Sequence, residues 1–423
     1  PTVEATTETV APTETTFAPT EATSATEGPS EETEATESTY ALADDSDVVA
    51  SGTCGAGGDN LTWVLTGDGI LTISGSGKMK DYDVFAYTEA PWYTRGEDIL
   101  SVVVKSGVTS IGKCAFSCCT RLTSVEIPEG VTSIGDAAFR ECYSLTSVEI
   151  PEGVIGISDG TFIYCEGLTS VTIPESVTSI GSQAFDGCSR LTGVEIPERV
   201  TTVGREAFYN CSSLTSVAIS ENVRSIGEAA FAYCKNLDSI LVNTENPNYT
   251  SINGVLFNKT CTTLLQYPAG KGNNTYEIPS SVTSIGAYAF GKCSRLVSVE
   301  IPKRVTSVGY SAFEGCSSLT GVVIPEGLTS IYDEVFCGCS SLTSVVIPES
   351  VTVIYQAFKG CKALTDVYYG GTEVQWNQIT IRYQNSDLLN ATIHYNYEME
   401  TGRLTLALSS PKAGAANVTL DEP

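Results

Sequence analysis

The chain has 423 residues, with 50 acidic and 23 basic side chains, and its formal net charge at pH 7 is -27. This charge argues against nucleic acid as a partner, because proteins that bind nucleic acid need basic patches, and against electrostatic docking to anionic lipid. No run of about 18 apolar residues occurs, so we expect no membrane insertion of this chain.

Residues 1–50 form a distinct first region. They contain nine Glu and three Asp but neither Lys nor Arg, and they are rich in Thr, as in the phrase APTE at Ala11. Such a segment buries too little apolar surface to offset the entropy of ordering, which predicts a disordered linker. It suits either a glycosylated or wall-crossing spacer of a secreted protein or a plain linker. Because the chain begins with Pro1, we expect an initiator methionine or signal peptide to precede it.

A repeat of 23 residues dominates the chain from Ile99 to Tyr369. Its clearest mark is an Ile-Pro pair at a constant phase: Ile127-Pro128, Ile150-Pro151, Ile173-Pro174, Ile196-Pro197, Ile278-Pro279, Ile301-Pro302, Ile324-Pro325 and Ile347-Pro348. The first copy contains ILSVVV at Ile99, and the last contains LTDVYY at Leu364. Self-similarity at a period of this size indicates a repeat architecture.

The copy that begins at Leu122 shows how one unit is expected to fold. Val125 and Ile127 alternate with polar residues, which predicts a strand with one buried face, and the following proline ends that strand. A second short extended piece comes next, and we interpret residues 136–139 as one helical turn that directs Phe139 inward. A unit this small cannot bury its apolar face alone, so stacked copies predict a β-rich solenoid with a parallel sheet.

The repeat resembles that of BspA-like bacterial surface proteins, whose pattern is close to CxxLxxIxIPxxVxxIGxxAF. The segment from Cys165 to Phe185 matches this pattern almost letter for letter. The resemblance covers residues 99–370 and implies a leucine-rich-repeat array. An interruption at 243–277 is also typical of the family, and within it Val255–Leu265 resembles a hairpin; we interpret it as a structural decoration or a binding loop.

The resemblance also assigns the flanking segments. Residues 51–98 are similar to the N-terminal β-hairpin cap of the family, with the hairpin at Asn60–Gly77, and residues 371–396 are similar to its C-terminal cap. Residues 397–423 are expected to be a linker or the start of a further domain. Caps are needed because the end of a solenoid otherwise exposes an unpaired strand and an open apolar section.

Three tryptophans lie in these flanks, namely Trp63, Trp92 and Trp376. We interpret them as lids over the ends of the solenoid. The alternative is that their rings bind sugars, since an amphipathic aromatic ring can also serve a binding surface.

Ten of the 15 cysteines follow the repeat Phe by three residues, so they form one predicted column: Cys119, Cys142, Cys165, Cys188, Cys211, Cys234, Cys293, Cys316, Cys339 and Cys361. Stacked side chains point the same way, so we expect free, buried thiols in this column. Five cysteines fall outside it: Cys54, Cys114, Cys118, Cys261 and Cys337. For Cys54, Cys114 and Cys118, one disulfide stays open as the alternative to free thiols.

We identify no catalytic, cofactor-binding or metal site, and we expect no enzyme activity and no cofactor. The single histidine, His394, alternates with Ile393 and Tyr395 and is interpreted as a strand residue rather than a base. Paired CxxC motifs for a metal and the GxxxxGK[ST] phosphate loop are both lacking. Acidic residues recur once per copy at one position, which is typical of a solvated face and not of an acid–base pair.

The outward positions of the strand column are expected to form a concave wall. Its main row is Glu126, Glu149, Thr172, Glu195, Ala218, Leu241, Glu300, Val323, Val346 and Tyr368. We propose Glu126, Glu149, Glu195 and Glu300 as the acidic part of a binding surface and Val323, Val346 and Tyr368 as its apolar anchor. The alternative is an ordinary solvated strand face whose valines reflect strand propensity alone.

The resemblance implies adhesion, since BspA-like proteins are associated with attachment to host matrix proteins or other cells. We therefore expect a secreted or cell-surface bacterial binding protein, an adhesin whose partner is an extracellular protein of the host or of bacteria. Two alternatives stay open: a glycan-binding module, and a structural spacer within a larger secreted protein.

Overall fold

The computed structural model describes residues 47–83 and 89–398. The chain divides into two units, Pro1–Ala43 and Asp44–Pro423, and all described residues lie in the second. The predicted linker at 1–50 and the predicted tail at 397–423 therefore lie almost wholly outside the described residues. One difference is visible at the linker boundary, because a strand already begins at Val48.

An antiparallel sheet caps the first repeat. It consists of β1 (Val48–Gly55), β2 (Gly58–Thr66) and β3 (Ile70–Gly75). The last of these, β3, pairs in parallel with the first repeat strand, with Ile73 opposite Val104. The hairpin expected at Asn60–Gly77 is confirmed as β2 and β3, and it covers the strand that would otherwise be a free edge.

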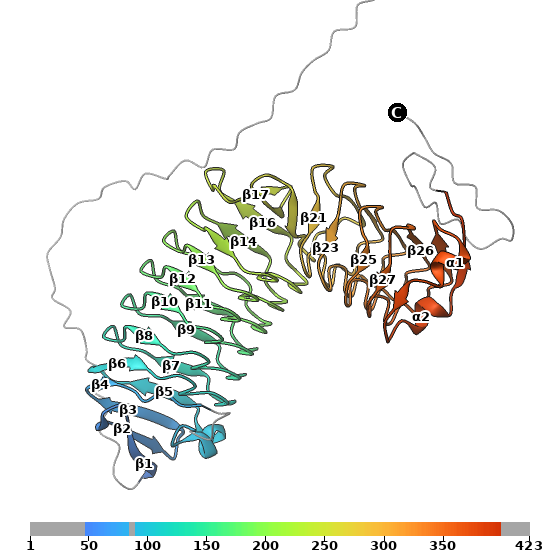
Figure 1. The fold of residues 1–423 in the computed structure, drawn as a ribbon. Coiled ribbons are helices and arrows are strands. Elements are labelled where there is room, and N and C mark those ends of the chain that lie inside the picture. Colours follow the sequence, from blue (N-terminus) through green and yellow to red (C-terminus); the bar gives the residue numbers. More distant parts are fainter. Residues whose placement is uncertain (1–46, 84–88, 399–423) are drawn as a thin grey trace, which may run out of the picture. The chain divides into compact units, whose positions relative to one another are not determined.

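The repeats build two columns of short parallel strands, and Figure 1 shows the copies following one another in chain order. The first column lies just before the Ile-Pro pair: β5 (Ser101–Val104), β7 (Ser124–Glu126), β9 (Ser147–Glu149), β11 (Ser170–Thr172), β14 (Ser216–Ile219), β16 (Ser239–Val242), β20 (Thr275–Glu277), β22 (Ser298–Glu300), β24 (Gly321–Val323), β26 (Ser344–Ile347), β28 (Asp366–Tyr369) and β30 (Thr392–His394). Equivalent residues lie opposite each other, as in Val102 with Val125.

The second column comes from the extended piece after the proline. Its strands are β4 (Gly77–Lys78), β6 (Val108–Ile111), β8 (Ser133–Ile134), β10 (Gly156–Ile157), β12 (Ser179–Ile180), β13 (Thr202–Val203), β15 (Ser225–Ile226), β19 (Thr263–Gln266), β21 (Ser284–Ile285), β23 (Ser307–Val308), β25 (Ser330–Ile331), β27 (Val353–Ile354) and β29 (Thr380–Ile381). The glycine that follows allows close stacking, since a Cβ on Gly135 would lie 2.5 Å from the main-chain nitrogen of Lys113.

A stack of phenylalanine rings fills the interior. From Trp92 through Phe116 to Phe231, neighbouring rings are stacked with centroids 5.2–5.7 Å apart. A second stack runs from Tyr267 through Phe290 to Phe358 with centroids 4.7–5.5 Å apart. The rings are almost wholly buried, so the predicted β-rich solenoid is confirmed.

The predicted helical turn at residues 136–139 is wrong. Ala137 and Glu141 both have positive φ, at 52° and 59°, which the residues of a right-handed helix do not have. The main-chain N–H groups of Ala137, Phe139 and Glu141 instead donate to carbonyl oxygens of the next copy at 2.8–2.9 Å. Three hydrogen bonds between copies outweigh the local preference for a helix.

The thiol column predicted from the spacing is confirmed, and all 15 cysteines are free. Each buried thiol from the second copy onward donates to the main-chain oxygen of the aromatic residue in the preceding copy, as Cys211 does to Phe185 at 3.1 Å. The thiols point along the stack, so each donates to a carbonyl group, and Cys142 and Cys316 also lie within hydrogen-bonding reach of the neighbouring thiols of Cys165 and Cys293. The disulfide considered among Cys54, Cys114 and Cys118 does not form.

Alkylation of the folded protein by iodoacetamide is expected to modify at most Cys118, Cys261 and Cys337, because only these three cysteines are partly exposed. Burial also raises the pKa of Cys119 and Cys234 to about 12, which keeps them as unreactive thiols. Mass spectrometry counts the labels. All 15 cysteines should react in denaturant without reductant; a shortfall there would reveal disulfides.

The interruption at 243–277 replaces part of one copy with a three-stranded sheet. There β17 (Tyr249–Ile252) and β18 (Val255–Asn258) are antiparallel, and β18 pairs in the same way with β19. The hairpin expected at Val255–Leu265 is confirmed, and β19 then joins the second column through β21. The buried core divides at this place into two clusters.

The C-terminal cap contains α1 (Glu373–Trp376) and α2 (Ser386–Leu389). Side chains here replace the carbonyl groups of a following copy: Asn385 Oδ1 accepts from the N–H of Phe358 at 3.1 Å, and Asp387 Oδ2 accepts from that of Gly360 at 2.8 Å. Donors that would be orphaned at the end of the stack are thereby satisfied.

Candidate binding surface

The wall comprises the outward side chains of the first strand column. Pairing places neighbours of the predicted row opposite each other, for example Glu149 with Thr172, Ala218 with Leu241, and Val323 with Val346. One member, Glu195, lies in a segment without strand pairing although its side chain is still exposed. The row therefore exists as a spatial feature, interrupted between β16 and β20.

Acidic side chains dominate the exposed part of the wall. Glu126, Glu149, Glu195 and Glu300 are all exposed, and none of their carboxylates has a salt-bridge or hydrogen-bond partner among the described residues. Serines alternate with these carboxylates along β7, β9 and β22. Unpaired carboxylates among small side chains leave a negative surface that a large partner can approach closely.

The predicted apolar anchor offers less surface than expected. Val346 is only 5 % exposed, and Val323 is half-buried. Tyr368 stacks on His394, with ring centroids 4.7 Å apart, and also contacts the ring of Tyr397 at 5.0 Å. These packing partners are remote in the sequence, so the alternation along one strand could not reveal them.

Two other residues of the wall offer side chains that a partner could contact more readily than the predicted apolar anchor. Leu241 is 56 % exposed, which makes it the most exposed large apolar side chain of the row. Glu277 lies opposite Glu300 and extends the acidic row past the interruption. Both residues could have been identified from the sequence. Leu241 belongs to the predicted row, and Glu277 precedes an Ile-Pro pair by one residue, as Glu126 does.

All three tryptophans are core residues. Trp63, Trp92 and Trp376 are 5 %, 1 % and 7 % exposed, and Trp92 donates from Nε1 to the main-chain oxygen of Ala115 at 2.9 Å. This burial confirms their role as lids and contradicts the alternative in which their rings bind sugars. Three tyrosines near the phenylalanine turns are exposed, namely Tyr143, Tyr164 and Tyr332, at 42 %, 39 % and 47 %.

The side of each copy that carries the turn around the repeat phenylalanine is called here the phenylalanine-turn side, and it does not include the wall. A buried carboxylate lies on this side. Asp186 is 4 % exposed, and burial together with the charge of Glu206 raises its pKa to about 7. Glu206 itself accepts hydrogen bonds from Gln183 at 2.8 Å and Arg205 at 2.6 Å. Glu206 is thus held by two donors, whereas no described residue donates to the Asp186 side chain.

The closing strand places His394 as expected, in β30. Its Nε2 lies 2.8 Å from Asp366 Oδ1, and this hydrogen bond lowers the pKa of Asp366. The pair is partly exposed and joins the last two strands of the first column. Thr365 Oγ1 donates to the other carboxylate oxygen, Oδ2, at 2.8 Å, so both oxygens of Asp366 are committed to contacts within the cap.

Within residues 47–83 and 89–398, no cluster of three or more His, Cys, Asp or Glu side chains could hold a metal ion. The same residues include no helix of the length and apolarity needed to span a bilayer.

Two strand columns, a ring stack, a thiol column and capped ends define a leucine-rich-repeat solenoid. The chain belongs to the family described as BspA type leucine rich repeat region (6 copies), whose model matches residues 93–170, 155–273 and 269–385. No curated protein sequence matches the chain.

Solved structures share this fold. A leucine rich cell surface protein from Faecalibacterium prausnitzii is 32 % identical, with a TM-score of 0.62 over 79 % of this chain and 98 % of that one. A leucine-rich repeat protein from Eubacterium ventriosum is 28 % identical, with a TM-score of 0.56 over 85 % and 98 %. The pneumococcal vaccine antigen PcpA, at 19 % identity and a TM-score of 0.55 over 84 % and 90 %, shares the fold alone.

Proposed function

We propose that this chain is a bacterial surface or secreted binding protein, an adhesin that presents the acidic wall to a positively charged region of an extracellular protein. The observation that supports this role is the row of exposed carboxylates without partners, Glu126, Glu149, Glu195 and Glu300. Carboxylates that no neighbour neutralises attract a positively charged partner. The main effect of this attraction is a higher association rate constant for that partner. The cell-surface description of the Faecalibacterium protein supports the proposed location.

Catalysis is not part of this proposal. The residues of the wall offer negative charge and small side chains, with no base held against a nucleophile. The expectation that the chain is not an enzyme therefore stays a prediction. A glycan-binding role would depend on exposed tyrosines such as Tyr332, since the tryptophan rings are buried.

Charge reversal in the double variant Glu126→Lys/Glu149→Lys is expected to weaken partner binding about tenfold, a loss of ~1.4 kcal/mol. Repulsion would replace attraction at two neighbouring copies of the wall. Binding is measured by surface plasmon resonance, at low and high salt, against a panel of extracellular-matrix proteins and a bacterial surface extract. Wild-type binding should weaken as salt rises, because the charges are exposed.

The matched control is Glu129→Lys/Glu152→Lys, which changes the net charge equally in the same two copies. Both of these glutamates are exposed in the turns that follow the strands. The control is expected to bind nearly as well as the wild type. Equal weakening by both variants would mean that total charge and not the wall governs binding, and unaltered binding of the wall variant would contradict the proposal.

A further inference from the structure

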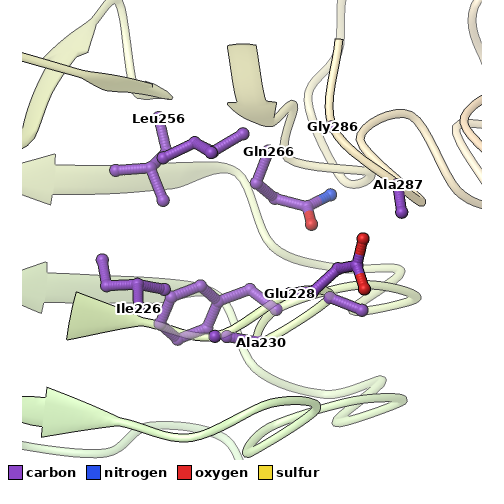
Figure 2. Close-up of a pocket in the computed structure, with 11 residues that line it drawn as sticks. Ile226, Glu228, Ala230, Leu256, Gln266, Gly286 and Ala287 are labelled. Carbon is purple, nitrogen blue, oxygen red and sulfur yellow. The ribbon is translucent and has the colours of Figure 1, made fainter. Parts of the chain in front are cut away.

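A pocket lies where the stack is interrupted, between the turn that carries Phe231 and the segments that carry Gln266 and Ala287. Its volume is about 270 Å³, and Figure 2 shows Gln266 and Glu228 bordering it from opposite sides. Small residues form much of its lining, including Ala229, Ala230 and Ala287. Their size lets a bound main chain come close to the walls.

The pocket coincides with a break in the hydrogen bonds between copies. In the preceding turn, the main-chain N–H groups of Glu206, Phe208 and Asn210 donate to carbonyl oxygens of the next copy at 2.8–3.0 Å. The equivalent donors one copy later belong to Ala229, Phe231 and Tyr233. Among the described residues, none of these three has an acceptor.

Every other complete turn satisfies these donors. The turn before the C-terminal cap does so with the side chains of Asn385 and Asp387. On the far side of the interruption, Tyr267 holds the place of the repeat phenylalanine, and its N–H donates to Ala289 O at 2.7 Å in the regular way. Among the described residues, no carbonyl group of the Tyr267 turn accepts from Ala229, Phe231 or Tyr233. The pocket therefore lies where a strand-like peptide segment belongs.

Gln266 adds an acceptor to the same space. Its side chain is 3 % exposed, and Nε2 is committed to Tyr267 O and Ala289 O. Its Oε1 has no donor among the described residues, and Figure 2 shows the amide directed into the space above Glu228. This oxygen is therefore available to accept a hydrogen bond from a ligand in the pocket.

The negative charge of Glu228 in the pocket lining determines which class of ligand fits. Unpaired N–H donors alone would suit an anion, but the carboxylate of Glu228 lines the same pocket and accepts from the Tyr310 hydroxyl at 3.1 Å. A carboxylate or phosphate would be repelled. A neutral amide offers a carbonyl oxygen to the N–H groups of Ala229 and Phe231 and an N–H to Gln266 Oε1, without adding a negative charge beside Glu228.

We propose that this pocket receives the main chain of a short segment of glycine or alanine residues from the protein partner, and that it completes the interrupted hydrogen-bond ladder by adding the missing peptide. The inference rests on the proposed function, since it supplies a second contact for the same partner. It concerns the phenylalanine-turn side of the copies and does not involve the glutamates of the wall.

The test uses a neutral probe, an acetylated and amidated alternating alanine–glycine hexapeptide, with hydrogen–deuterium exchange of the whole chain as the readout. In the free protein, residues 227–234 are expected to exchange faster than residues 204–211, because their donors are unpaired. The peptide should slow exchange at 227–234 and leave 204–211 unchanged. Equal protection of both turns in the free protein would overturn the inference.

The variant Ala287→Tyr is expected to fill the pocket and to weaken peptide binding about tenfold or more, equal to at least ~1.4 kcal/mol. Position 287 tolerates a large residue, since Tyr310 occupies the equivalent place one copy later. Ser182→Tyr makes the same change beside a turn whose donors are paired, and it should bind like the wild type. Melting temperatures of all three proteins establish that each is folded.

Other outcomes separate the possible failures. Protection of 227–234 by sodium acetate but not by the peptide would identify an anion site and refute the amide assignment. Retention of peptide binding in Ala287→Tyr would also refute it. A matrix partner that binds Ala287→Tyr as strongly as the wild type, yet loses affinity for the Glu126→Lys/Glu149→Lys variant, would reject the pocket and leave the wall proposal intact.

Discussion

Replacing Phe185 with alanine is expected to lower the free energy of unfolding by about 3–5 kcal/mol. The ring is fully buried and stacks on both sides, with centroids 5.4 Å from Phe162 and 5.2 Å from Phe208. Alanine would leave a void that neighbouring copies cannot close, because the hydrogen bonds between their turns fix the spacing. Urea unfolding followed by circular dichroism measures the loss.

The control for this prediction is Phe231→Ala. That ring stacks on one side only, against Phe208 at 5.7 Å, and its other side borders the pocket at the interruption. Phe231→Ala should therefore lower the free energy of unfolding less than Phe185→Ala does, since fewer contacts are lost. Equal losses for the two variants would mean that ring stacking along the column adds nothing beyond burial.

The Asp186→Asn variant is expected to be more stable than the wild type above pH 7, by roughly 1–4 kcal/mol. Burial and the charge of Glu206 raise the pKa of Asp186 from 3.8 to about 7 in the folded protein. Between these two pH values the folded state holds a proton that the unfolded state has released, so the stability of the wild type falls as pH rises through this window. Asparagine removes that dependence.

Stability is measured by urea unfolding across the same pH range. Below a pH of about 4, Asp186 is protonated in both the folded and the unfolded protein. The wild type and the variant should therefore have the same free energy of unfolding there. Glu198→Gln removes the same charge from an exposed turn and should leave the pH profile almost unchanged. A constant difference between Asp186→Asn and the wild type at every pH would show that Asp186 does not titrate in this window.

The repeat could be derived from the sequence because each copy carries the same local signals. Alternating residues such as Val125 and Ile127 define the strand, and the inward Phe139 and Cys142 recur at fixed distances from it. The tight turn between them could not be derived. Its residues favour a helix in isolation, and hydrogen bonds to the following copy, such as Ala137 N–H to Asp159 O at 2.9 Å, override that preference.

The candidate site was predictable in its outline only. Alternation identified Glu126 and Glu149 as outward residues, because their orientation depends on the strand alone. The accessibility of Val346 and Tyr368 depends on packing against remote segments, as the contact between Tyr368 and His394 shows. The pocket was not predictable either. It exists because the interruption leaves the turn of Phe231 without the carbonyl groups that the next copy would provide.

The matching donors and acceptors of successive turns have a consequence for how the gene can change. Any copy can follow any other, so recombination between similar copies can delete or duplicate a unit of 23 residues and keep both capped ends. Each event alters the reach of the protein by about 4.8 Å without a new fold having to evolve. A deletion that spanned the interruption would instead restore an acceptor to Phe231, and would thereby abolish the pocket.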